Sequence, residues 1–252
     1  MSRAQESLQL VRRHARRRGW LRLPSPPGGF DVGVKPDIYL PTYEELLGHL
    51  RFRRFTILEL GVWHGNSLQM WRDAFPRARI VGVDLEPPPD LALGPRVHIV
   101  RGDQTDGTLL TRLREQHAPD GFEVIIDDAS HMGITSARSL QQLYRQHLRA
   151  GGTYIIEDWG TGYVPAWFDG GDLQAPVGIA HLDASPAAMQ EDRPAPIPMP
   201  SHDIGLVGVV KRLVDHVAST TLGAHQPDRL EEPLPIDWMR VHDGLVVLRK
   251  PR

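Results

Sequence analysis

The 252-residue chain contains no cysteine. This absence excludes disulfide bridges, thiolate metal sites and cysteine nucleophiles. No apolar stretch approaches the length that spans a membrane, and the N-terminus lacks the apolar core of a signal peptide. Charge of one sign is not in excess either: the formal net charge is −2, which argues against nucleic acid as the main partner. We therefore expect a cytoplasmic protein that binds neither membranes nor nucleic acid.

What is present is an alternation of strand and helix patterns. Strands are predicted at 56–60, 79–84 and 97–102, then in a run that ends at Asp127 and in another that follows Gly151 and Gly152. Helices are predicted at 67–75, around 108–117 and at 134–148, the last one ended by the two glycines. Residues 238–241 and 245–250 resemble a closing hairpin. This rhythm predicts a doubly wound, mostly parallel Rossmann-like α/β sheet with an antiparallel hairpin at its end.

Two segments interrupt the rhythm. Residues 1–40 form an irregular arm that carries a basic run from Arg12 to Arg18, for which a solvated helix face is a better interpretation than an anion site. The remainder, 41–252, is predicted to be one domain that begins with a helix at 41–47. Within it, residues 159–203 are rich in Gly, Pro and aromatic residues, which predicts a lid over an acceptor site. A disordered insertion is the alternative, but it would leave several aromatic side chains in water.

Acidic residues gather where two of the predicted strands end. Asp127 and Asp128 follow one buried run, Glu157 and Asp158 follow the next, and His131 lies three residues after Asp128. The carboxyl ends of parallel strands are where open α/β sheets bind ligands. Grouped carboxylates repel one another unless a cation or a shared proton compensates them. The pattern predicts a metal-dependent active site, although Asp127 or Asp158 can alternatively cap the following helix.

The first three strands also end in acids. Glu59 precedes the turn from Gly61 to Gly65, Asp84 ends the second strand, and Asp103 with Gln104 follows the third. The glycines allow a tight turn and a close approach to a ligand, while no Lys-Ser/Thr follows that would make a Walker phosphate loop. Glu59 suits an ammonium group, Asp84 a ribose, and Gln104 an adenine edge. Ser67 and Asp127, which flank these turns, complete the expected cofactor set; taken singly, each residue can also be simple turn chemistry.

These residues carry a resemblance to a known family. Glu59-Leu-Gly61, Asp84 and Gly102-Asp103 together resemble the class I S-adenosylmethionine (SAM)-dependent methyltransferases. The segments 125–131 (IIDDASH) and 155–163 (IIEDWGTGY) look more specifically like the metal-dependent sugar O-methyltransferases of macrolide pathways, of the mycinamicin and macrocin type. The cephalosporin hydroxylase family is similar. The likeness covers roughly residues 40–165; Ala129 and Gly162 depart from the usual pattern.

The resemblance implies roles for individual residues. Asp128, Glu157 and Asp158 match the family's magnesium ligands, and His131 matches its general base. As a ligand of the catalytic metal, Asp128 is also expected to take part in catalysis. Glu59, Asp84 and Asp103 match the SAM contacts. The implied reaction is SAM- and Mg²⁺-dependent methylation of a hydroxyl of a sugar or vicinal diol on an antibiotic-type secondary metabolite. A homo-oligomer is expected. The alternatives are a catechol-type or other small-molecule O-methyltransferase, and a non-catalytic SAM-binding protein.

The residue types independently favour this chemistry. Carboxylates without cysteine form a hard oxygen site suited to Mg²⁺, with Mn²⁺ or Ca²⁺ possible, and a single nearby histidine argues against a two-histidine iron site. A sugar hydroxyl is a poor nucleophile at neutral pH, so a cation that lowers its pKa and a base such as His131 would act together.

Overall fold

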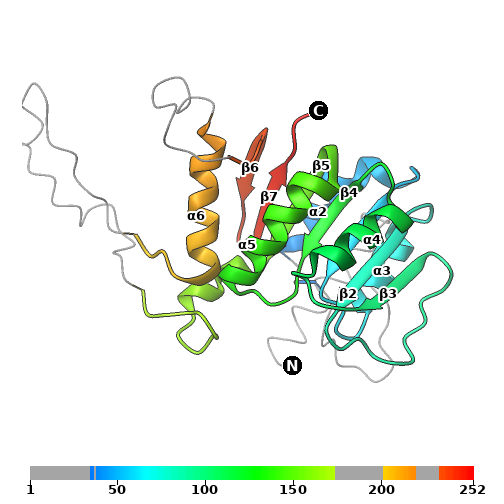
Figure 1. Ribbon diagram of the computed structural model, residues 1–252, viewed down its shortest axis with the longest axis horizontal. Helices are drawn as coiled ribbons and strands as arrows, with labels where there is room; N and C mark the ends of the chain where they lie inside the picture. The colour runs from blue at the N-terminus through cyan, green and yellow to red at the C-terminus, as the bar shows by residue number, and fades with distance from the viewer. Residues whose placement is uncertain (1–34, 37, 174–200, 220–232) are drawn as a thin grey trace, which may run out of the picture.

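The computed structural model describes residues 35–36, 38–173, 201–219 and 233–252. The basic run of the N-terminal arm and most of the predicted lid lie outside these ranges. The described strands form one seven-stranded sheet in the order β3-β2-β1-β4-β5-β7-β6. Figure 1 shows β2 and β3 at one end of the sheet and the hairpin of β6 and β7 toward the other. Among the described helices, none is long and apolar enough to cross a membrane.

Six of the described strands run in the same direction, and β7 alone among them is reversed. The strands are β1 (Thr56–Leu60), β2 (Arg79–Asp84), β3 (Val97–Arg101), β4 (Phe122–Asp127), β5 (Leu148–Glu157), β6 (Trp238–Val241) and β7 (Leu245–Arg249). Strand β1 pairs in parallel with both β2 and β4, whereas β7 is antiparallel to both β5 and β6. The connections switch direction at β1, so the carboxyl ends of β1, β2 and β4 open the crevice in which such sheets bind ligands. The predicted fold class is confirmed.

Helices cover both faces of the sheet. They are α2 (Tyr39–Leu47), α3 (Asn66–Ala74), α4 (Gly107–His117), α5 (Gly133–Gln142) and α6 (Gly205–Val217), with short turns η1 (Gly48–Leu50), η2 (Leu143–His147) and η3 (Trp159–Tyr163). Because side chains alternate along a strand, Ile57 joins the core under α2 and α3, while Leu58 joins the core under α4, α5 and α6. Strand β1 is buried along its whole length, as its continuous apolar run predicts.

One predicted boundary is wrong. Gly151 and Gly152 do not end the helix: α5 ends at Gln142, η2 continues it as a π-turn, and both glycines lie inside β5. The carbonyl groups that end this helical stretch are bound instead by the ammonium of Lys250, which donates to the oxygens of Tyr144, Arg145 and Leu148 at 2.7 to 3.0 Å. A charge from the far end of the chain thus replaces the glycine cap that the local pattern predicted.

The described parts of the predicted lid, 159–173 and 201–203, lie beside the sheet and α6. Turn η3 packs against α6, and Gly162 accepts a hydrogen bond from buried His202 at 2.7 Å. Phe168 is 88% exposed. Most of the predicted lid, residues 174–200, lies outside the described ranges, so the lid stays a prediction.

Candidate active site

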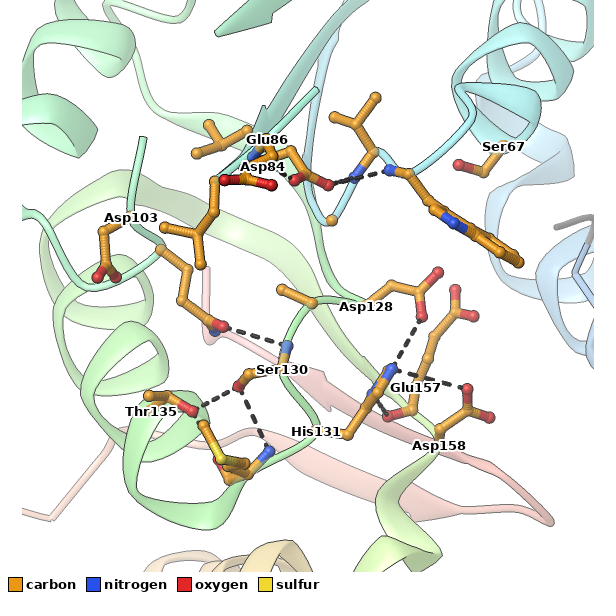
Figure 2. A pocket seen from close by; sticks show the side chains of 18 of the residues that line it. Ser67, Asp84, Glu86, Asp103, Asp128, Ser130, His131, Thr135, Glu157 and Asp158 are labelled. Carbon is orange, nitrogen blue, oxygen red and sulfur yellow. Dashed lines mark hydrogen bonds and ion pairs between the residues drawn. The ribbon is translucent and has the colours of Figure 1, made fainter. Parts of the chain in front are cut away.

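A cavity of about 910 Å³ lies at the carboxyl ends of the central strands. It brings together residues from the carboxyl ends of β1 to β5 and from the turns that follow these strands; Figure 2 shows several of them. The predicted residues that line it are Gly61, Ser67, Asp84, Asp103, Gln104, Asp128, His131, Glu157 and Asp158. Five of the eight residues predicted for a cofactor and all three predicted for a metal therefore line one shared cavity.

Three predicted cofactor residues do not line this cavity. Gly65 adopts a positive φ of 79° just before α3, which is a turn function. Asp127 is buried and accepts hydrogen bonds from Gln104 and from the Tyr154 hydroxyl, at 3.2 and 3.4 Å; burial raises the pKa of Asp127 to about 6. The third is Glu59, which is fully buried.

Glu59 lies beneath the cavity at 0% exposure. One carboxylate oxygen accepts a hydrogen bond from the indole of Trp71 at 3.0 Å, and the other lies 2.7 Å from the ammonium of Lys35. Burial raises the pKa of Glu59, and Lys35 opposes that shift. The partners of this carboxylate in the structure are thus two side chains of the protein, and its ammonium partner is that of Lys35 rather than that of a cofactor.

Asp84 holds the glycine turn in place. Its carboxylate accepts hydrogen bonds from the backbone N–H groups of Val62, Trp63 and Glu86 at 2.7 to 2.9 Å. Burial alone would raise the pKa of Asp84, but the three N–H donors outweigh burial and lower it. The turn itself passes so close to strand β4 that a Cβ on Gly61 would lie 2.1 Å from the backbone oxygen of Asp128.

The carboxylates form two overlapping groups. Ligand atoms of Asp128, His131 and Asp158 lie within 4.8 Å of one another, as do those of Glu59, Asp128 and Glu157. Asp128 belongs to both groups. Oxygen donors at this spacing, without sulfur, fit a hard divalent cation such as Mg²⁺. The three predicted ligands thus share one wall of the cavity, although Glu157 and Asp158 fall in different groups.

Three donors from the N-terminal side meet these carboxylates, and the sequence prediction missed all three. The Lys35 ammonium contacts Glu59, Asp128 and Glu157; the Tyr39 hydroxyl donates to Asp158 and the Tyr43 hydroxyl to Glu157. Tyr39 and Tyr43 are spaced by four within α2, the helical repeat that places side chains on one face, whereas Lys35 precedes the helix. The spacing of the two tyrosines was the available signal, but no local pattern indicated which surface this face would meet or that Lys35 would join it.

Burial sets the protonation preferences here. Burial opposes the charged form of Lys35, but its carboxylate neighbours, Asp128 first, outweigh it and raise the pKa of Lys35 well above the usual value. Burial raises the pKa of Glu157 to about 8, and Lys35 only partly opposes this shift. Lys35 does not cancel the effect of burial on Glu157, because its one ammonium is shared among three carboxylates and the cluster keeps an excess of negative charge.

His131 is held with one ring nitrogen toward the carboxylates. Its Nδ1 lies 3.3 Å from the carbonyl oxygen of Glu157, which can only accept, so Nδ1 carries the proton in that hydrogen bond. Nε2 then faces Asp128 at 3.7 Å and Asp158 at 3.9 Å (Figure 2). The backbone of His131 has a positive φ of 50°, and its carbonyl accepts a hydrogen bond from the Thr161 hydroxyl at 2.7 Å. The arrangement suits a general base whose Nε2 receives a proton.

The sheet order, the reversed last strand and the shared cavity define a Rossmann-like methyltransferase fold. The solved structure of MycE methyltransferase from the mycinamycin biosynthetic pathway, in complex with Mg and SAH, superposes with a TM-score of 0.63 over 84% of this chain and 48% of that chain, at 26% identity. A second MycE structure, which also contains mycinamycin VI, gives a TM-score of 0.61 over 88% of this chain and 51% of that chain, at 26% identity.

Curated relatives point to sugar O-methyltransferases. The chain is 38% identical over 136 residues to the 8-demethyl-8-(2-methoxy-alpha-L-rhamnosyl)-tetracenomycin-C 3'-O-methyltransferase of Streptomyces olivaceus, covering 51% of this chain and 34% of the relative. It is 34% identical over 143 residues to the mycinamicin VI 2''-O-methyltransferase of Micromonospora griseorubida, covering 54% and 35%. The matches therefore span about a third of the length of these relatives. No family model matches the chain.

The chain is thus similar to antibiotic sugar O-methyltransferases in sequence and in fold, as the resemblance predicted. Its likeness to the cephalosporin hydroxylase family stays a prediction. So do the roles of the individual site residues.

Proposed function

We propose that the chain is a SAM- and Mg²⁺-dependent O-methyltransferase that methylates a hydroxyl of a sugar or vicinal diol on a small-molecule glycoside. The observation that carries this proposal is the position of His131. Its Nε2 lies within 4 Å of two carboxylates, in the same cavity that the strand-end residues Asp84 and Asp103 line. Methylation of a hydroxyl requires a proton acceptor, a cation site and a binding site for the nucleoside part of SAM. One cavity holds candidates for all three.

Each side chain has one task in this proposal. When bound, SAM supplies an electrophilic methyl group and Mg²⁺ lowers the pKa of a coordinated hydroxyl. Asp128, Glu157 and Asp158 would hold the cation. His131 accepts the hydroxyl proton at Nε2, and its Nδ1–H bond to the Glu157 carbonyl keeps the ring in place. The strand ends with Asp84 and Asp103 would face the cofactor.

The relatives support the choice of acceptor class. Two of them are named for methylating glycosides, one a rhamnosyl tetracenomycin and one mycinamicin VI. The MycE complexes contain Mg and SAH, which supports the two cofactors. Because the chain spans about a third of these relatives' length, the identity of the acceptor has to be established on this protein itself.

The test is a methyl-transfer screen with matched controls. Purified protein is incubated with methyl-labelled SAM, MgCl₂ and either rhamnosylated polyketides, mycinamicin VI or simple catechols, and products are detected by mass spectrometry. Transfer to a glycoside that stops with a chelator and in His131→Ala supports the proposal. Transfer to catechols alone would favour the catechol-type alternative. SAM binding by calorimetry without transfer to any acceptor would favour the non-catalytic alternative.

We further propose that the chain consists of an arm at 1–40 and a methyltransferase domain at 41–252, in which 159–203 form an acceptor lid. We also propose a homo-oligomeric state and a cytoplasmic location. Limited proteolysis tests the lid, since cleavage within it should slow when SAM and acceptor are added. Light scattering after size exclusion tests the oligomeric state.

A further inference from the structure

Lys35 occupies a position that a divalent cation would also favour. Its ammonium nitrogen lies 2.7 Å from Glu59, 2.5 Å from Asp128 and 2.8 Å from Glu157. The side chain is only 3% exposed. Lys35 is thus a cation held by the protein itself, surrounded by carboxylate oxygens of which two belong to the expected metal ligands.

The expected metal ligands do not converge while Lys35 is in place. Among the described residues, the Glu157 carboxylate groups with Asp128 around Lys35, whereas the Asp158 carboxylate groups with Asp128 around His131. Tyr43 and Tyr39 add a hydrogen bond to Glu157 and to Asp158, respectively. A Mg²⁺ ion needs its oxygens at about 2.0–2.1 Å, so Glu157 and Asp158 must approach each other to share it. The Lys35 contacts to Asp128 and Glu157 oppose that movement.

Two cations at these oxygens would also repel each other. An ammonium within 3 Å of Asp128 and Glu157 and a divalent ion bound to the same two carboxylates would lie only a few ångströms apart in a buried setting, where repulsion is weakly screened. Lys35 precedes α2, which begins at Tyr39, so its side chain can leave without unwinding that helix.

We propose that Lys35 is a tethered counter-cation that exchanges with the divalent ion: the ammonium neutralises Asp128 and Glu157, and loading of Mg²⁺ displaces it from them. This inference rests on the proposed function, since it concerns the metal that the reaction would use. It makes Lys35 a determinant of metal affinity, and it couples metal loading to the segment that precedes α2.

Amine labelling of the wild-type protein tests the exchange directly. The chain has three lysines, Lys35, Lys211 and Lys250, so each can be followed by peptide mass spectrometry. Lys211 donates to Ser201 and to the His202 carbonyl, and Lys250 binds carbonyls near η2, so both serve as internal references. The full chain is treated with an acetylating reagent in MgCl₂ and in NaCl at equal ionic strength. We expect Mg²⁺ to raise Lys35 labelling at least about tenfold, equivalent to about 1.4 kcal/mol of lost protection, with the references unchanged.

Calorimetric titration with MgCl₂ gives a second readout. Lys35→Met keeps the chain length without the charge and should bind Mg²⁺ at least about tenfold more tightly than wild type, whereas Lys35→Arg keeps a competing cation and should not. If Lys35→Met folds poorly because its carboxylates are unpaired, the wild-type labelling still decides the matter.

The outcomes separate this inference from the proposed function. Bound Mg²⁺ with Lys35 still protected would overturn the exchange, whether or not methyl transfer occurs. Absence of Mg²⁺ binding in both wild type and Lys35→Met would overturn the exchange and the metal site together. Exposure of Lys35 by Mg²⁺ without methyl transfer to any acceptor would support the exchange and refute only the proposed reaction.

Discussion

Replacing Asp84 with alanine should destabilise the protein before any cofactor is bound. The sequence pattern predicts only a ribose contact for this residue. In the structure, its carboxylate also accepts three backbone hydrogen bonds, two of them from the glycine turn at Val62 and Trp63. Trp63 has a positive φ of 43°, so the turn depends on support from outside.

The size of the stability loss in Asp84→Ala depends on which of the three N–H donors water can reach after the carboxylate is removed. The hydrogen bonds from Trp63 and Glu86 are exposed, so water can replace the carboxylate there at a cost of a few tenths of a kcal/mol each. The bond from Val62 is partly buried, and an unsatisfied N–H there costs about 1–3 kcal/mol. We expect Asp84→Ala to lower the free energy of unfolding by about 2 kcal/mol, or the melting temperature by about 4–8 °C for a chain of this size.

Thermal unfolding without ligand, followed by calorimetry with SAM, is the assay. Asp103→Ala is the matched control. Asp103 lines the same cavity, but among the described residues its carboxylate accepts hydrogen bonds from Thr105 alone, within its own turn. The control should lose less than about 0.5 kcal/mol. Since its donors lower the pKa of Asp84, the stabilising contribution of Asp84 should persist above about pH 4 and disappear as the pH falls through the lower folded value. An unchanged melting temperature for Asp84→Ala would refute the supporting role and leave only the cofactor contact.

Three further predictions test other parts of the site and core. Gly61→Ala should be far more damaging than Gly94→Ala in denaturant unfolding, because both have φ near 90° but only Gly61 would clash, with Asp128; equal losses would contradict this reasoning. Asp128→Asn should require more Mg²⁺ for methyl transfer, while His131→Ala should keep its Mg²⁺ affinity and lose about 10²–10⁴-fold in turnover; near-normal turnover would exclude His131 as the base. Burial, then Arg114, lowers the pKa of His147, so wild type should lose stability as the pH falls below about 6.5, where only the unfolded chain takes up that proton. His147→Gln should show a shallower loss in urea midpoint between pH 7.5 and 5.5, and parallel curves would rule out this contribution.

Much of the fold was predictable because its determinants are local. Strand β1 reads as a buried strand from five successive residues, and β4 ends at Asp127 as its run of Val and Ile indicates. In a parallel sheet the carboxyl ends of the strands lie on one edge. Acidic residues at the ends of neighbouring strands therefore necessarily lie close together. For this reason Asp128, His131 and Glu157 could be named from the sequence and do line one cavity.

Contacts between distant segments were decided only by the tertiary structure. Lys35 lies 93 residues before Asp128, and Tyr39 lies 119 residues before Asp158. No local period encodes these contacts. Lys250 replaces the predicted glycine cap because β7 places it beside η2. Glu59 was correctly placed at a strand end, but the packing of Trp71 and Lys35 over it determined that its carboxylate is buried beneath the cavity. The alternation of residues within an element determines which side chains are buried, whereas the partner of a buried charge depends on how whole elements pack together.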